Sequence, residues 1–339
     1  SHYQPFAGIY NTYMVPYLDN HGRMLSMLCD AIKGVYASVF FKDSKAYMQA
    51  TRNVIDEEKM AVVLQEVVGR RYGDHFYPNI SGVGRSLNYY PLDDERAEEG
   101  TVSLALGLGK YIVDGGRTLR VCPAHPARVL QTSDTEMALR ETQTRFCALD
   151  LKNMGENFSV DDGFNLLRLP VKVADADGAL QFIASTFNPT DQVHYPGLYP
   201  GGRKIISFVG VLEHDVVPLP QIMREVLQMG EEAMRRPVEI EFAVEIDAKN
   251  RSCVFYLLQI RPMVDVRTEV NIDLSAIDPA RVLLRSDNAL GHGNFDALTD
   301  VVYVKTDDYS AGNNPLIAEE IEHLNAGFLA EGRHYVLIG

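Results

Sequence analysis

Residues 238–262 read VEIEFAVEIDAKNRSCVFYLLQIRP and predict two strands joined by the polar turn DAKNRS. In the first strand, Glu239 and Glu241 alternate with Ile240 and Phe242. Because successive side chains of a strand point to opposite faces, both carboxylates should share one face while the apolar pair packs on the other. The sequence therefore predicts a hairpin with one polar and one apolar face.

The second strand of this hairpin carries Gln259 and Arg261 two positions apart, so they too should share a face. Two carboxylates on one face suit a hard cation, and with the amide and the guanidinium they suit Mg²⁺ and bound phosphates. The alternative is a solvated sheet face with a surface pair between glutamate and arginine. The spacing alone leaves both interpretations open.

Regular elements are predicted before the hairpin as well. Apolar residues recur at helical spacing over 218–234, and residues 205–212 predict a strand. A strand over 102–106 is followed by the short helix KYIV at 110–113. The apolar run MAVVLQEVV at 60–68 predicts a buried strand, with an edge that hydrogen-bonds a purine as the alternative.

The composition excludes several classes of protein. The 339 residues are 46% hydrophobic and 23% charged, which is enough apolar material for more than one compact unit. The net charge of −14 has the wrong sign for gripping nucleic acid or anionic lipid. With no apolar stretch long enough to span a bilayer and no signal peptide, we expect a soluble, cytoplasmic protein. The four cysteines form no CxxC pair, which argues against a zinc site and a disulfide framework.

Several segments occur in an order known from one enzyme family. They are FAGIYNTYM, EEKMAVVLQEVVG, YPNISGVGRSLNYYP, LALGLGKYIVDGG, and EIEFAVEI followed by YLLQIRP. In this order they resemble the ATP-grasp nucleotide-binding region of pyruvate phosphate dikinase and phosphoenolpyruvate synthase, over most of residues 3–263. The resemblance implies an α+β (mixed α/β), ATP-grasp-like nucleotide-binding fold with antiparallel sheets and flanking helices, plus the start of a following domain.

The resemblance assigns a role to each polar residue of the hairpin. Glu241 and Gln259 would be Mg²⁺ ligands, and Glu239 would support the metal or the ribose side of the nucleotide. Arg261 would contact the transferring phosphates, which makes it the expected catalytic residue. Arg85, in SGVGRS, stands where the family often has a Thr-Arg pair, although the local sequence departs from that pattern.

Two further segments would complete the nucleotide site by the same resemblance. Gly8 and Thr12 would lie on a glycine loop that covers the phosphates, and Gln65, Glu66 and Val68 would line the adenine pocket at an interdomain hinge. The residues themselves allow Gly8 and Thr12 to present backbone N–H groups and a hydroxyl to phosphate oxygens. An ordinary glycine-containing turn before a helix is the alternative.

The activity implied is that of an ATP-dependent phosphotransferase of the kinase or dikinase class. It would move a phosphoryl group from Mg·ATP to a carrier histidine on a phosphohistidine domain and onward to pyruvate in a phosphoenolpyruvate/pyruvate barrel. Neither of these two domains is within this sequence, and the family's upstream phosphate-binding lysine and arginine are also missing. We therefore expect the chain not to complete the reaction alone. A homodimer is left open.

Two alternatives to this function are retained. One is an ATP-grasp phosphotransferase with a different acceptor, as in the rifampin phosphotransferases that resemble this family. The other is a non-catalytic nucleotide-binding or scaffolding module, for which the altered loop GIYNTY and a large insertion leave room. Restored full-length protein that binds nucleotide without any histidine phosphorylation would favour the non-catalytic module.

The chain is expected to divide into four segments. Residues 1–123 would form the glycine-loop and adenine-side subdomain, and residues 124–203 an insertion or lid-like region. Residues 204–264 would hold the hairpin that binds metal and phosphate. A change to fewer apolar repeats, VDVRTEVNIDLSAIDPARVLL, predicts that 265–339 form a linker and the start of the next domain.

Overall fold

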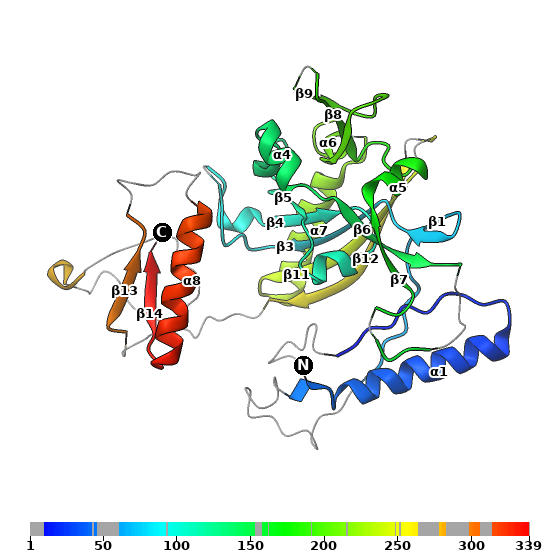
Figure 1. Cartoon of the computed structure of the whole chain (residues 1–339), viewed down its shortest axis with the longest axis horizontal. Coiled ribbons are helices and arrows are strands. Elements are labelled where there is room, and N and C mark those ends of the chain that lie inside the picture. The colour runs from blue at the N-terminus through cyan, green and yellow to red at the C-terminus, as the bar shows by residue number, and fades with distance from the viewer. Residues whose placement is uncertain are drawn as a thin grey trace. The chain divides into compact units, whose positions relative to one another are not determined.

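A computed structural model of the chain defines two compact units, Ser1–Val264 and Asp265–Gly339, and each is described by itself. The structure describes residues 10–42, 44–45, 61–92, 94–152, 158–161, 163–190, 192–214, 216–247, 249–250, 252–263, 278–282, 298–305 and 314–338. Mixed helices and antiparallel sheets make up the first unit, which confirms the predicted fold class (Figure 1).

A five-stranded sheet lies at the centre of the first unit. Its strands are β3 (Ile80–Arg85), β4 (Thr101–Ala105), β5 (Leu119–Val121), β11 (Val238–Asp247) and β12 (Ser252–Pro262). They lie in the order β12-β11-β3-β4-β5, and every neighbouring pair is antiparallel. The predicted hairpin is confirmed as β11 and β12, with the polar turn between them.

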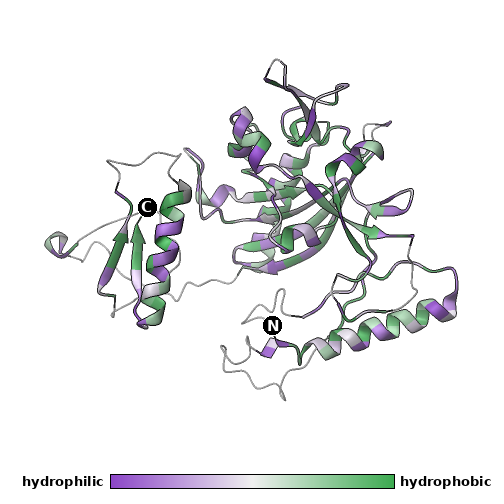
Figure 2. Cartoon of the chain, viewed as in Figure 1, coloured by the Kyte–Doolittle hydropathy of each residue, from purple (hydrophilic) through white to green (hydrophobic). Residues whose placement is uncertain are grey.

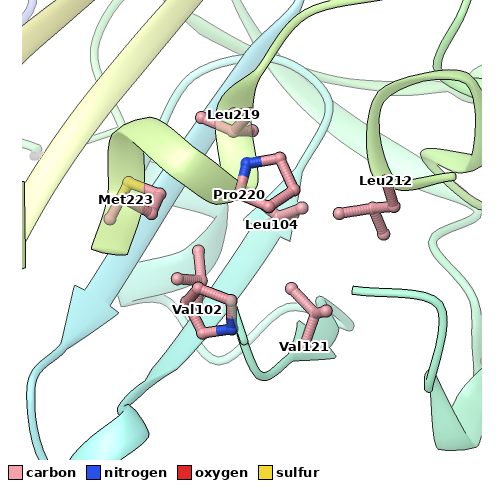
Figure 3. A pocket seen from close by; sticks show the side chains of 8 residues that line it. Val102, Leu104, Val121, Leu212, Leu219, Pro220 and Met223 are labelled. Atoms are coloured by element: carbon pink, nitrogen blue, oxygen red, sulfur yellow. The ribbon is translucent and has the colours of Figure 1, made fainter. Parts of the chain in front are cut away.

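One face of this sheet is apolar and is covered by two helices, α6 (Val209–Leu212) and α7 (Leu219–Met234). Figure 3 shows where they meet the sheet, with side chains converging from β4, β5, α6 and α7: Val102, Leu104, Val121, Leu212, Leu219, Pro220 and Met223. The gap among them holds about 10 Å³, no more than one water needs. Ile240 and Phe242 of β11 are also fully buried. The predicted alternation in β11 is therefore confirmed.

Two glycines of β3 allow the close packing on the apolar face. A Cβ on Gly82 would lie 2.6 Å from Cε1 of the Phe242 ring, and a Cβ on Gly84 would lie 2.5 Å from the Met223 methyl of α7. Because these positions alternate with Val83 and Arg85, the glycines face the helix and the larger side chains face away. The SGVGR sequence thus makes room for Phe242 and α7 on one face of the sheet.

The substitution Gly82→Ala is expected to lower the free energy of unfolding by about 1–3 kcal/mol, because the added methyl overpacks the core against the Phe242 ring. Chemical denaturation would measure the change. Gly109→Ala is the matched control, because its Cβ meets nothing closer than 3.8 Å and its φ of −59° suits alanine. Equal stability of the Gly82→Ala and wild-type chains would contradict the close packing described here.

Two more antiparallel sheets complete the first unit. One has the order β1-β2-β6-β7 and the other β10-β8-β9. Their strands are β1 (Arg70–Tyr72), β2 (His75–Tyr77), β6 (Arg145–Asp150), β7 (Leu166–Pro170), β8 (Ala184–Asn188), β9 (Val193–Pro196) and β10 (Arg203–Ile206). Phe146 and Ile183 lie in the same apolar core as the central sheet. A lid role for residues 124–203 stays a prediction, as do the other proposed segments.

One of the remaining helices of this unit precedes the strands, and the others lie between them. They are α1 (His21–Ser38), α3 (Lys110–Val113), α4 (Thr135–Glu141) and α5 (Val171–Ala176), with 3-10 turns η2 (Ala97–Glu99) and η3 (Leu130–Thr132). The predicted KYIV helix is confirmed as α3, and the helix predicted over 218–234 is confirmed as α7. Among the described residues, no helix combines the length and apolar character needed to cross a bilayer.

Two predicted strands are wrong wholly or in part. Residues 61–69 form no strand, and Val63 and Leu64 are 82% and 66% exposed, because no neighbouring strand pairs with this segment. Over 205–212, β10 ends at Ile206 and α6 follows. Phe208 adopts a left-handed backbone with φ of 51°, which turns the chain away from the sheet. Most of the apolar residues of 205–212 are buried, but only the first two of them belong to a strand.

The second unit contains a strand, a helix and a second strand. β13 (Asp300–Tyr303) and β14 (Tyr335–Ile338) pair in parallel, and α8 (Asn314–Ala330) connects them, as a parallel pair requires. The short turn η5 (Pro279–Arg281) precedes them. Figure 2 shows hydrophobic residues along both strands. This arrangement differs from the antiparallel sheets of the first unit.

Candidate functional site

The polar face of the β11–β12 hairpin brings together the four residues that the sequence singled out. Glu239 lies directly opposite Arg261, and Glu241 lies directly opposite Gln259. Directly opposed residues of an antiparallel pair have Cβ atoms about 4.5–5.5 Å apart, so their side chains are within reach of one another. The register shifts immediately after Glu241, where β12 accommodates an extra residue. The two pairs are therefore neighbouring rungs of the polar face, because the pair Ile240–Ile260 between them belongs to the apolar face.

Glu239 is an anchor between two arginines. Its carboxylate accepts hydrogen bonds from Nε of Arg85 at 2.7 Å and from Nε of Arg261 at 2.9 Å. The Glu239 side chain is only 9% exposed. Burial alone would raise its pKa, but the hydrogen bonds and positive charges of Arg261 and Arg85 outweigh burial and lower it. Glu239 is thus ionised and committed to holding the two guanidinium groups.

Glu241 has a different environment on the next rung. Burial raises its pKa and the charge of Glu239 raises it further, while Arg261 offsets only part of this effect. Among the described residues, none donates a hydrogen bond to the Glu241 carboxylate. A half-buried carboxylate without such donors keeps its oxygens available, and a cation bound there would favour its ionised form.

The side-chain oxygens of Glu241 and Gln259 are of the kind that bind a magnesium ion. Mg²⁺ prefers oxygen ligands, and Glu241 supplies a carboxylate beside the amide oxygen of Gln259. Arg261 stands on the neighbouring rung with its guanidinium oriented by Glu239. The arrangement can therefore hold a hard cation next to a fixed positive group, which is the chemistry of a metal-bound phosphate.

The same polar face extends across the sheet to further basic residues. Arg85 lies opposite Glu239 and Thr101 lies opposite Arg85, so Arg261, Glu239, Arg85 and Thr101 form one row over four strands. Arg120 of β5 donates from Nε to Oγ1 of Thr101 at 3.1 Å. The structure places Arg85 on this polar face, where its Nε donates to Glu239; a role for Arg85 in nucleotide binding stays a prediction.

Sequence reasoning missed Arg120. It is anchored by hydrogen bonds to Asn88 and to the Tyr90 carbonyl, and it lies over the Tyr90 ring at 5.4 Å from the centroid. The signal that could have found it is its place between buried Leu119 and Val121, which turns the arginine to the opposite face of a short strand.

The residues expected at the adenine pocket lie on the exposed segment 61–69. The Gln65 amide donates to the backbone carbonyl of Leu258, next to Gln259 in β12, at 3.2 Å. Glu66 is exposed and Val68 is half-buried. The structure therefore places Gln65 against β12, and within the described part of the chain no hydrogen bond or ion pair joins Glu66 or Val68 to the four hairpin residues.

The residues expected to cover the phosphates are not brought to the hairpin by any observed contact. Gly8 lies outside the described residues. Thr12 is exposed, and its neighbours contact other parts of the unit. The Asn11 backbone N–H donates to Oγ of Ser38 at 3.2 Å, and the Tyr13 hydroxyl donates to the Val160 carbonyl at 2.9 Å. A phosphate-covering role for Gly8 and Thr12 stays a prediction.

Comparison with known proteins supplies the family. The family model described as "Pyruvate phosphate dikinase, AMP/ATP-binding domain" matches residues 1–273, which include every candidate site residue described above. A comparison with curated proteins gave no match. The match covers most of the 339 residues and agrees with the resemblance seen in the sequence. The chain therefore belongs to the pyruvate phosphate dikinase family and carries its AMP/ATP-binding domain.

Proposed function

We propose that the polar face of the β11–β12 hairpin binds Mg·ATP for phosphoryl transfer to a histidine on another domain. The observation that carries this proposal is the pairing of Glu241 with Gln259 on one rung, beside Glu239 with Arg261 on the next. Membership of the family supports ATP binding by the domain. Glu241 and Gln259 would hold the metal, and Arg261 would face the phosphates.

The catalytic contribution of these residues would be positioning and charge neutralisation. Mg²⁺ bound between Glu241 and Gln259 would offset negative charge on the phosphate oxygens. Arg261 is the proposed catalytic residue, because its fork of donors can follow charge on the transferring group. Glu239 is a positioning residue, since it fixes Arg261 through charged hydrogen bonds.

The nucleotide's other end would lie along residues 61–69. This segment forms neither helix nor strand, and no described strand pairs with it, so its backbone groups could meet a purine edge. Gln65 links the segment to β12 through the Leu258 carbonyl and sets it beside the metal ligands. We propose that Gln65, Glu66 and Val68 contribute to the adenine pocket, with Gly8 and Thr12 closing over the phosphates.

The transfer itself needs no nucleophile from this chain. A P–O bond of ATP would break and a P–N bond to the carrier imidazole would form, with the acceptor supplied by a phosphohistidine domain. That domain would pass the group onward to pyruvate. We place this chain in the first half of such a sequence, as an ATP-dependent phosphotransferase domain.

Calorimetric titration tests the nucleotide site. With Mg²⁺ in excess, ATP is expected to bind at about pH 7.5 and to lose affinity severalfold at about pH 5.5, above the ordinary glutamate pKa of about 4.3. The reason is that Glu241 must be ionised to hold the metal, and burial raises its pKa, so protons compete with Mg²⁺ at a higher pH than usual.

Two further titrations make this result specific. ATP without Mg²⁺ should bind more weakly, because the metal makes the link to Glu241. Mg·AMP should also bind more weakly than Mg·ATP, because it lacks the phosphates that Arg261 and the metal would hold. Equal affinity for ATP with and without Mg²⁺ at both pH values would contradict the proposed metal site.

A further inference from the structure

A second group of potential metal ligands lies outside the nucleotide site. Glu99, Cys122 and His125 each offer one ligand atom, and these three atoms all lie within 4.8 Å of one another. Nε2 of His125 is 3.2 Å from Oε2 of Glu99. The Cys122 thiol is buried, while Glu99 and His125 are half-buried. The proposed nucleotide site uses none of these residues.

The fold builds this group at one end of the β4–β5 pair. Val102 lies opposite Val121, so Glu99, just before β4, and the turn 122–125, just after β5, meet at the same end of the sheet. The His125 N–H donates to the Cys122 carbonyl at 3.0 Å and closes this turn. The turn therefore brings the Cys122 sulfur and the His125 imidazole, three positions apart in the sequence, close to each other.

The turn also directs donors toward the sulfur. The backbone N–H groups of Ala124 and His125 act to lower the pKa of the Cys122 thiol, as hydrogen bonds to a thiolate do. Such bonds stabilise a thiolate once it is formed. In the metal-free chain burial dominates and raises the pKa of Cys122, so the thiol keeps its proton.

A cleft leads to the carboxylate of this group. It has a volume of about 330 Å³ and lies between the 3-10 turn η2, the turn at Ala124 and helix α7. Its lining includes four glutamates and one arginine: Glu98, Glu99, Glu231, Glu232 and Arg224. Because carboxylates outnumber the positive group, the cleft favours the approach of a cation.

We propose that Glu99, Cys122 and His125 form a binding site for a divalent transition metal of the Zn²⁺ type. One thiolate, one imidazole and one carboxylate match the ligands that zinc takes, whereas Mg²⁺ does not use sulfur. Nitrogen and oxygen ligands about 2.0–2.1 Å from zinc stand about 3.3 Å apart in a tetrahedron, close to the observed 3.2 Å. Three protein ligands leave the fourth position of a tetrahedral zinc ion for water or another ligand.

Metal binding at this site would change two protonation states. The Cys122 thiol would lose its proton to solvent as its sulfur binds the metal, and the coordinating nitrogen of His125 would have to be unprotonated. The backbone N–H of Arg96 donates to Oε2 of Glu99 at 2.9 Å and would hold that carboxylate in place. Binding is therefore expected to strengthen as the pH rises.

Absorption spectroscopy with Co²⁺, which occupies zinc sites and is coloured, tests the proposal on the whole chain. One Co²⁺ per chain should give thiolate-to-metal charge-transfer absorption, and added Zn²⁺ should remove it by displacement. The band should be lost in Cys122→Ser and should need about tenfold more Co²⁺ or higher in Glu99→Gln and His125→Gln. Oxygen ligands at Glu241 and Gln259 would not produce this band, so the result is independent of the nucleotide site.

Cys29→Ser is the matched control, because Cys29 is an exposed thiol on α1 and should leave the band unchanged. Circular dichroism would confirm that each variant is folded. If Cys122→Ser does not fold, Glu99→Gln and His125→Gln provide the test. Absence of thiolate absorption in the wild-type chain would overturn the proposal. A band that survives in Cys122→Ser, or that both Glu99→Gln and His125→Gln leave at full affinity, would do so as well.

Discussion

Glu241→Gln is expected to weaken Mg·ATP binding by about 100-fold or more, while raising the melting temperature of the metal-free chain by about 2–4 °C. Binding is lost because glutamine cannot supply the charged oxygen that holds the metal between β11 and Gln259. Stability is gained because the wild-type carboxylate is half-buried, lies beside Glu239 and receives no hydrogen bond from the described residues. The Glu241 carboxylate would therefore bind the metal at the expense of the stability of the metal-free chain.

The size of this stability difference depends on pH. Because the pKa of Glu241 is raised in the folded chain, its ionised form destabilises the fold, and this penalty is present above the folded pKa. As the pH falls and Glu241 takes up a proton, the difference between Glu241→Gln and wild type should shrink, and it should vanish only below the unfolded pKa of about 4.3. Thermal denaturation at about pH 7.5 and at about pH 5, in a metal chelator, would measure it.

Glu245→Gln is the control for both measurements. Glu245 lies on β11, on the same face as Glu241 but further along the strand and opposite Val254. It should leave both Mg·ATP affinity and melting temperature close to wild type. A Glu241→Gln chain that melts lower than wild type at neutral pH would contradict the destabilising effect of the Glu241 charge, and one that keeps its affinity for Mg·ATP would contradict the assignment of Glu241 as a metal ligand.

Glu239→Ala should cost about 1–3 kcal/mol of unfolding free energy and should also weaken Mg·ATP binding about tenfold. The stability cost follows from leaving Arg85 and Arg261 without their shared carboxylate. The cost lies below the about 3–5 kcal/mol seen for fully buried pairs, because these side chains are 49% and 30% exposed and can turn to water. Binding weakens because Arg261 loses the group that orients it.

Denaturation of Glu239→Ala, of Arg85→Ala and of the double variant would measure this coupling. The double variant should lose less unfolding free energy than the sum of the two single losses, because the hydrogen bond between Arg85 and Glu239 can be lost only once. Glu225→Ala, an exposed position on α7, should change stability by less than about 0.5 kcal/mol. Full additivity would show that Glu239 and Arg85 do not stabilise each other.

The pH dependence of Glu239 should be opposite to that of Glu241. Its pKa is lowered in the folded chain by the two arginines, so its contribution to stability is present above the unfolded value of about 4.3. That contribution is lost as the pH falls through the folded pKa. Two glutamates on one face of one strand therefore have opposite electrostatic roles, one holding the arginines and one available to a metal.

The period-two pattern was sufficient to predict the hairpin's two faces. Strand geometry sends alternate side chains to opposite sides, so the shared face of Glu239 and Glu241 followed without any knowledge of the neighbouring strands. The pattern could not show that Glu239 is shared between Arg261 and Arg85, because β3 lies more than a hundred residues earlier in the chain. Only the strand order brings those side chains together.

The same limit explains the errors. The apolar run at 60–68 has the composition of a buried strand, but whether a strand forms depends on a neighbour with unpaired backbone groups, and residues 61–69 have none. The absence of a CxxC pair argues only against a zinc site whose ligands lie close together in the sequence. Glu99 reaches Cys122 and His125 only through the pairing of β4 with β5.

The sequence by itself determined the α+β class, the amphipathic hairpin, helix α7 and the family resemblance, because each rests on local periodicity or on the order of segments along the chain. The tertiary structure decided which arginines Glu239 holds, that Glu241 accepts no hydrogen bond from the described residues, and that a thiol, an imidazole and a carboxylate meet beyond β5. The physical reason is that burial and charge pairing depend on distances in space, and long-range strand pairing sets those distances.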